Sequence, residues 1–218
     1  MEDARITQMD EQYFLTFAAV SRHGIATALA TTHSFEEFFR RGLLFCPENK
    51  DVVLFPERLG NQFCSLHRPT TSHPFCCPEI WLASSPDLRF WGMHQPLCRG
   101  TADWERGRIG GGSPPIRTDR GWLLIYHGSC RIAEPEQVGI YSAGAMLLDL
   151  ERPERVIGRS AKPLFGPTME FEQHGFVPNV VFPSGAVVRD DLLQVFYGAA
   201  DTSTAVIEVP MNVVLSRL

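Results

Sequence analysis

Short apolar runs alternate with polar turns along most of the chain, and no long segment keeps a helical period. Four β-rich runs align with one another, and each follows a polar turn; they occupy 12–18, 62–68, 121–127 and 192–198. A second apolar run follows each of them, at 25–30, 80–84, 143–150 and 205–209. The segment 35–42 reads briefly as a helix and is too short to matter. The pattern therefore predicts an all-β chain built from repeated strand pairs.

A second sequence marker repeats beside these strands. The segments LATTHSFEEF (29–38) and LASSPDLRFW (82–91) match position by position, and LLDLERPERVIG (147–158) is a looser third copy. Their hydroxyl and aspartate side chains suit a tight turn between antiparallel strands, and the aromatic residue that follows can pack between neighbouring sheets.

Units of about 45 to 70 residues with three or four short strands each are typical of a β-propeller. We therefore expect one propeller domain over 1–218, with about four blades visible in the chain. A β-sandwich whose strands resemble one another by accident is the alternative fold.

Composition narrows the classes of function. The chain has 218 residues, 44% of them hydrophobic, and a net charge of −5, so it offers no basic field for nucleic acid. It has no run of 18 apolar residues and no charged, apolar leader, from which we expect a cytoplasmic protein without a membrane partner. Its six cysteines show no C-x-x-C spacing, so we expect reduced structural thiols and no metal site.

Polar residues follow the four aligned runs, and they give the first indication of a site. We take these runs as the innermost strands of the blades, so their tips should converge on the central axis. The residues at the tips are Arg22, His23, Arg68, His127 and Asp201. One buried histidine alone is more often a core residue than a ligand, but cations from several repeats are costly to bury together without an anion. The segment RGRIGGG (106–112) adds arginines and glycines that let the backbone approach a ligand closely.

Several ordered motifs resemble glycoside hydrolase family 130, the β-mannoside phosphorylases and β-mannosidases. They are ENKDVVLFPE, LHRP, IWLASSPDLRFWG, RIGGGSPPIRT, GWLLIYHG, GAMLLDL, GFVPNVVFPSGAVV and FYGAADT, and they extend from residue 2 to about residue 202. The resemblance implies a five-bladed propeller and inverting phosphorolysis of β-mannosides, which releases α-mannose 1-phosphate. Inorganic phosphate would be a co-substrate, and no cofactor is implied.

The resemblance also implies roles for individual residues. The opening Glu-Asp-Ala-Arg matches the family's Glu-Asp-Pro-Arg, which makes Asp3 the general acid. The implied phosphate ligands are Lys50, Arg68, Arg108 and His127. Substrate contacts are expected from Arg5, Arg22, His23, Glu79, Tyr141 and Asp201, although a structural role for Glu79 and Tyr141 stays open.

The sequence departs from the family pattern near Asp3. Ala4 replaces the usual proline, and the family places a complete first blade before this motif, so we expect that blade to be missing before residue 1. An acid so close to the chain end should be poorly positioned, which would impair activity. A β-mannoside hydrolase and a non-catalytic sugar-binding propeller are the alternative functions. The linkage (β-1,4 or β-1,2), the acceptor and a homo-oligomeric state stay open.

Overall fold

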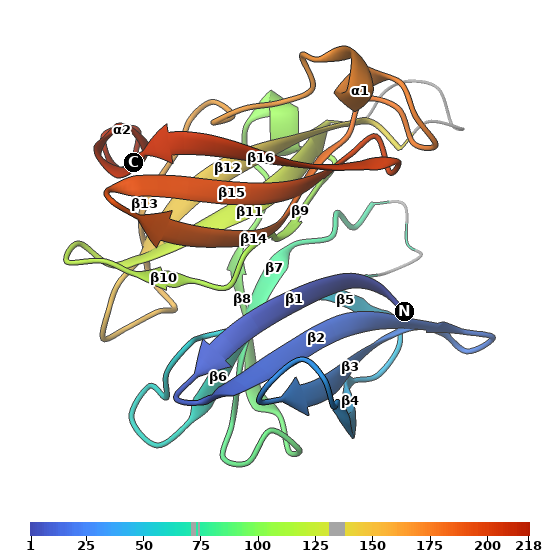
Figure 1. Ribbon diagram of the computed structural model, residues 1–218, viewed down its shortest axis with the longest axis vertical. Helices are drawn as coiled ribbons and strands as arrows, with labels where there is room; N and C mark the ends of the chain where they lie inside the picture. Colours follow the sequence, from blue (N-terminus) through green and yellow to red (C-terminus); the bar gives the residue numbers. More distant parts are fainter. Residues whose placement is uncertain (71–72, 74, 131–137) are drawn as a thin grey trace.

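Four antiparallel sheets follow one another along the chain in this computed structural model, which describes residues 1–70, 73, 75–130 and 138–218 (Figure 1). The first sheet contains β1 (Glu2–Met9), β2 (Gln12–Ser21), β3 (Gly24–Thr32) and β4 (Phe39–Phe45). The second contains β5 (Asn49–Leu54), β6 (Phe63–Pro69), β7 (Ile80–Ser85) and β8 (Gly92–Cys98). The predicted all-β propeller architecture, with four blades in the chain, is confirmed.

The other two sheets pack together in the upper half of Figure 1. The third contains β9 (Arg108–Gly111), β10 (Ile116–Arg117), β11 (Trp122–Cys130), β12 (Ile140–Leu148) and β13 (Val156–Arg159). The fourth contains β14 (Val181–Arg189), β15 (Leu192–Ala199) and β16 (Ser203–Pro210). Helical structure is limited to η1 (Asp103–Glu105), α1 (Glu170–Gln173) and α2 (Met211–Leu215) within the described ranges. None of these helices is long and apolar enough to cross a membrane.

The innermost strands differ from the prediction. The aligned runs form β2, β6, β11 and β15, which are the second strands of their sheets. The strands nearest the axis are β1, β5, β9 and β14, because β1 contacts both β5 and β14, and β5 contacts β9. The innermost strands are harder to read from the sequence because β9 has only four residues, two of them glycine, and irregularities interrupt the alternation of β1, β5 and β14.

A bulge interrupts each of three innermost strands at a similar level. In β1 the register shifts between Glu2 and Arg5, and in β5 it shifts between Lys50 and Val53. In β14 the shift lies between Pro183 and Gly185. A bulge adds one unpaired residue and turns its side chain away from the regular alternation. The extra residues of β1 and β5 include Asp3 and Asp51, which both have a positive φ, at 54° and 56°.

Apolar clusters between neighbouring sheets fix the orientation of the blades. Phe55 and Trp122, both fully buried, meet edge to face between the second and third sheets, with ring centroids 5.3 Å apart. A second cluster joins the first and second sheets around Phe14 and Phe45, and a third joins β11 and β12 to β15 around Ile125. The rigid packing of these sheets positions the inner strands and the side chains they carry.

The repeated turn marker has the predicted function. Thr32 Oγ1 accepts the backbone N–H groups of Ser34 and Phe35, and Ser85 Oγ likewise accepts those of Asp87 and Leu88. In the third copy, Asp149 Oδ1 accepts two backbone N–H groups in the same way. The hydroxyl or carboxylate therefore closes an equivalent turn in three sheets.

Candidate active site

Three side chains meet in the interior: Asp51 of the innermost strand β5, and Arg68 and His127 of the second strands β6 and β11. Arg68 Nη1 lies 2.6 Å from Asp51 Oδ2 and 3.1 Å from His127 Nε2, and His127 Nε2 lies 3.4 Å from the same Asp51 oxygen. The side chains of Asp51 and His127 are fully buried, and that of Arg68 is 5% exposed. The interior of the propeller therefore holds a charged cluster, which needs close mutual pairing to offset its desolvation.

Asp51 is the anionic centre of this cluster, and the sequence analysis did not single it out. Burial opposes its ionisation, but Arg68, His127 and Arg5 surround it and hold the pKa of its carboxyl well below the usual range. Its positive φ, within the bulge of β5, is one that aspartate and asparagine tolerate better than most residues. The equivalence that points to Asp51 is structural, because it occupies the same place in the bulge of β5 as Asp3 does in the bulge of β1.

His127 is held by packing against two aromatic rings. Its ring lies 4.5 Å from the Phe182 ring and 5.7 Å from the Tyr141 ring, measured between centroids. Burial lowers the pKa of His127, which the nearby Asp51 only partly opposes, so the imidazole is neutral at pH 7. Gly110 faces it across the β9–β11 pair, where a Cβ atom would lie only 2.6 Å from His127 Cε1 and 2.3 Å from Asp51 Oδ2.

Arg5 adds a third buried basic side chain. Its Nε donates to the Gly112 carbonyl at 2.6 Å, and its Nη1 donates to the Asp3 carbonyl at 2.6 Å. The guanidinium also lies 5.0 Å from the centre of the Phe182 ring, a cation–π distance. Arg5 thus joins β1 to the segment after β9 and fixes the backbone beside Asp3.

Asp3 and Lys50 form an ion pair beside the buried cluster. Lys50 Nζ lies 3.0 Å from Asp3 Oδ2, and the two side chains are 23% and 25% exposed. We expected Asp3 to be poorly positioned because it is close to residue 1. The structure instead holds its side chain through Lys50 and its backbone carbonyl through Arg5.

A cleft of about 700 Å³ opens over this ion pair. Its polar lining includes Glu2, Asp3, Arg5, Lys50, Tyr141 and Asp201, and aromatic walls are supplied by Phe176 and Phe182. Hydrogen-bonding groups with aromatic walls are the usual composition of a sugar site. A groove of about 660 Å³ between β1 and β14 has one charged lining residue, Arg117, and contains none of the sequence-predicted site residues.

The sequence-predicted residues fall into two groups. The structure brings Asp3, Arg5, Lys50, Tyr141 and Asp201 to the cleft, with Arg68 and His127 in the cluster behind it. Arg108 is half-buried on β9, two residues before Gly110 and thus on the same face of the strand.

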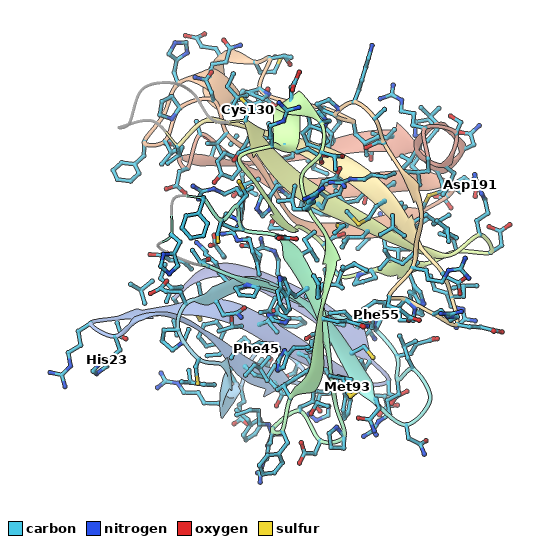
Figure 2. All side chains as sticks on the ribbon, turned by 180° about the vertical axis from the view of Figure 1, so that it is seen from behind. His23, Phe45, Phe55, Met93, Cys130 and Asp191 are labelled. Carbon is cyan, nitrogen blue, oxygen red and sulfur yellow. The ribbon has the colours of Figure 1, made fainter. Side chains whose placement is uncertain are left out.

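The structure does not bring Arg22, His23 and Glu79 to the cleft. Arg22 and His23 lie in the exposed β2–β3 turn, and His23 projects outward from the end of this hairpin (Figure 2). Glu79 is half-buried just before β7, near Cys98 and not among the cleft residues. These three expected substrate contacts therefore do not line the cleft of this structure.

The match to a known family covers nearly the whole chain. The model of glycoside hydrolase family 130, described as beta-1,4-mannooligosaccharide phosphorylase, matches residues 1–217. The chain is 42% identical over 219 aligned residues to the beta-1,2-mannobiose phosphorylase of Listeria innocua, covering 100% of this chain and 60% of that protein. It is 37% identical to the 1,2-beta-oligomannan phosphorylase of a Thermoanaerobacter species, covering 97% of this chain and 69% of that protein.

The solved structures agree with the sequence comparison. The Listeria innocua beta-1,2-mannobiose phosphorylase in complex with beta-1,2-mannobiose superimposes with a TM-score of 0.91 and 43% identity, over 100% of this chain and 60% of that one. The chain thus spans 60% of the length of this relative. The motifs, the sheet arrangement and these matches lead to one conclusion: the chain belongs to glycoside hydrolase family 130.

Proposed function

We propose that this protein cleaves β-mannosides by inverting phosphorolysis and releases α-mannose 1-phosphate. The observation that carries the proposal is the arrangement of an acid and basic side chains: Asp3 in the cleft, paired with Lys50, and Arg68 and His127 directly behind. The relatives at 42% and 37% identity are named as phosphorylases of β-1,2-linked mannosides, which supports the same reaction class here.

The reaction needs one proton donor and one held nucleophile. A phosphate oxygen attacks the anomeric carbon from the face opposite the glycosidic oxygen, and a C–O bond to phosphate forms as the glycosidic C–O bond breaks. Asp3, as the carboxylic acid, gives its proton to the leaving oxygen, directly or through a hydroxyl of the sugar, and takes up a proton from solvent after the products leave. The configuration at the anomeric carbon inverts, so a β-mannoside gives an α-phosphate.

The basic side chains would hold the phosphate and offset its charge. Lys50 lines the cleft, and the Arg68 guanidinium, with its planar fork of N–H groups, suits a phosphate oxygen pair. Each charge-assisted hydrogen bond contributes about 1.5 to 3 kcal/mol, so a few of them are enough for binding at millimolar phosphate. Arg108, on the face of β9 that carries Gly110, is a further phosphate ligand in this proposal.

Hydrolysis by the same fold would need a second carboxylate to activate water. Glu2 and Asp201 also line the cleft, so carboxylates are available near Asp3. The buried cations favour phosphorolysis, because a hydrolase has no phosphate charge to offset. The assay below separates these two reactions.

The test is an incubation of the protein with β-1,2-mannobiose or β-1,4-mannobiose, with and without inorganic phosphate. We expect α-mannose 1-phosphate and mannose in equal amounts, only with phosphate, and faster release from the β-1,2 disaccharide in line with the relatives. Asp3→Asn should lose about 100- to 10,000-fold in rate. The matched control is Asp10→Asn, because Asp10 is an exposed aspartate that also has a positive φ.

Each alternative has its own outcome. Mannose released at the same rate without phosphate identifies a hydrolase. Mannobiose binding without turnover, unchanged in Asp3→Asn, identifies a sugar-binding propeller. If the protein neither binds nor cleaves either disaccharide, the proposal is wrong.

A further inference from the structure

The contact between Arg68 and His127 determines which atom is the hydrogen-bond donor. Every N–H of a guanidinium can donate and none of its nitrogens accepts. At 3.1 Å from Arg68 Nη1, His127 Nε2 must therefore be the acceptor and carry no proton. The alternative, an Nε2–H donating to Asp51, would span 3.4 Å and would bring two N–H groups against each other.

The second ring nitrogen then carries the proton of the neutral imidazole. Burial keeps the ring neutral by lowering the pKa of His127, so one nitrogen is protonated and the other is not. Among the residues that the structure describes, His127 Nδ1 has no hydrogen-bond partner, although the ring is fully buried. A buried N–H without a partner is costly and therefore rare in a native protein.

The neighbours of this ring connect it to the cleft. Tyr141 and Phe182 pack against the His127 ring, and both also line the cleft. The unpaired donor thus lies directly behind the wall of the proposed sugar and phosphate site. An anion oxygen that reaches the ring would supply the acceptor that this donor lacks.

We propose that Asp51 is a positioning residue: it holds Arg68 so that the proton of His127 stays on Nδ1, as a donor for the substrate anion. Asp51 itself is unsuited to contact that anion, because an ionised carboxylate offers only acceptors and repels another anion. The identity of the anion as phosphate rests on the proposed function, whereas the position of the proton does not.

Two effects of Asp51 on anion binding have opposite signs. Its negative charge repels an anion, so electrostatics alone predicts that Asp51→Asn binds phosphate more tightly. Loss of the positioned guanidinium and imidazole predicts weaker binding instead. The sign of the change in affinity therefore separates a positioning role from a simple charge near the site.

The first experiment measures the ring nitrogens of His127 directly, by long-range proton–nitrogen correlation spectra of the nitrogen-15-labelled protein near pH 7. We expect protonated Nδ1 and unprotonated Nε2 in the unaltered chain. A spectrum with the proton on Nε2, or a charged ring, would overturn the proposal without any variant.

The second experiment compares Asp51→Asn with the control Asp10→Asn. Both aspartates have a positive φ, at 56° and 52°, so asparagine is tolerated at both positions and the backbone change is matched. We expect Asp51→Asn to give a mixture of His127 tautomers and at least tenfold weaker phosphate binding by calorimetry. We expect Asp10→Asn to give the unaltered spectrum and affinity. An unchanged tautomer, or equal or tighter phosphate binding in Asp51→Asn, contradicts the positioning role.

Failure of the proposed function has a different signature. If no variant binds phosphate but the tautomer changes as expected, the positioning role stands and phosphorolysis does not. If Asp51→Asn does not fold, Arg68→Gln is the substitute variant. It removes the guanidinium that donates to His127 Nε2 and should change the tautomer in the same way. A single Nδ1-protonated tautomer in folded Arg68→Gln overturns the route through Arg68.

Discussion

Lys50 Nζ and Asp3 Oδ2, 3.0 Å apart, join the first two innermost strands, β5 and β1, at the mouth of the cleft. Both side chains are about a quarter exposed, so water screens their attraction. Ion pairs of this kind contribute about 0 to 1 kcal/mol to folding. In the proposed reaction, Lys50 would contact the phosphate and leave Asp3 to the leaving oxygen, so the pair would serve substrate binding more than stability.

Replacement of Lys50 should weaken phosphate binding with little effect on the stability of the fold. We expect Lys50→Met to change the free energy of unfolding by less than about 1 kcal/mol and to raise the KM for phosphate about tenfold or more. Urea denaturation and initial rates at varied phosphate check the two parts. Lys162→Met, at an exposed lysine outside the cleft, is the control. An equal rise in KM for both variants would show that the effect comes from overall charge.

Gly110 is required by the space around the buried cluster. An alanine Cβ at this position would lie 2.3 Å from Asp51 Oδ2 and 2.6 Å from His127 Cε1, so the cluster would have to move. Overpacking of this kind costs about 1 to 3 kcal/mol. We expect Gly110→Ala to lower the free energy of unfolding by that amount and to lower kcat/KM for phosphorolysis about 100-fold, since about 1 Å of misplacement costs that much.

The control for this substitution is Gly92→Ala in β8. Nothing lies within 4 Å of the added Cβ there, and the residue has no positive φ that would strain an alanine. Urea denaturation and rate measurements on both variants make the comparison. Unaltered phosphorolysis in Gly110→Ala would mean that the Asp51–His127 arrangement is not needed for activity.

The fold could be predicted because the second strand of each sheet is strongly apolar. The strand β11 is buried along nearly its whole length, and its repeats β6 and β15 follow similar turns. The innermost strands could not be identified in the same way, because bulges and glycines interrupt their alternation. The local sequence pattern thus predicted the number of sheets. It did not show which strand of each sheet lies nearest the axis.

The ends of the second strands led to cleft or cluster residues only in the sheets where these ends lie at the same level beside the axis. Arg68 and His127 pair across to the innermost strand at the same level, opposite Lys50 and Gly110. In the first sheet the corresponding position is Ala18, opposite Glu2, and β2 continues for three more residues to Ser21. The longer hairpin carries Arg22 and His23 away from the axis, which no local sequence signal reveals.

A buried carboxylate near the third sheet should be important for stability. Glu105 accepts hydrogen bonds from Tyr126 Oη and Arg159 Nη2, both at 2.7 Å, and from the backbone N–H groups of Thr101 and Ala102. Its side chain is 1% exposed. Truncation would leave the half-buried guanidinium of Arg159 without its carboxylate partner, so we expect Glu105→Ala to lower the free energy of unfolding by about 3 to 5 kcal/mol.

Asp103→Ala in the same short helix η1 is the comparison for this loss. Asp103 pairs with Arg106 at the surface, where their side chains are 92% and 70% exposed, and its removal should change stability little. Urea denaturation of both variants provides the measurement. A loss in Glu105→Ala no larger than in Asp103→Ala would mean that the buried carboxylate contributes little net stability.

Acid sensitivity should come from a buried histidine on the far side of β6. His67 is 3% exposed, it stacks on Phe45 at 4.5 Å, and Asn49 lies 3.0 Å from its Nδ1. Burial, with a smaller contribution from His94, lowers the pKa of His67 to about 3. Because an unfolded histidine titrates near pH 6.5, only the unfolded chain takes up this proton between about pH 6.5 and 3. The stability from the neutral ring is therefore complete above about pH 6.5 and is lost as the pH falls.

This loss of stability can be measured as the slope of the free energy of unfolding against pH. Below its unfolded pKa, one such histidine lowers the free energy of unfolding by up to about 1.4 kcal/mol per pH unit, or roughly 2 to 3 kcal/mol at pH 4.5. The buried ring of His127, with its lowered pKa, acts in the same direction. We expect His67→Gln to reduce the slope between about pH 6.5 and 4.5 in urea denaturation, where carboxylates contribute little. His33→Gln, at an exposed histidine, is the control variant. Equal slopes in the unaltered protein and in His67→Gln would show that this histidine takes up its proton in the folded state.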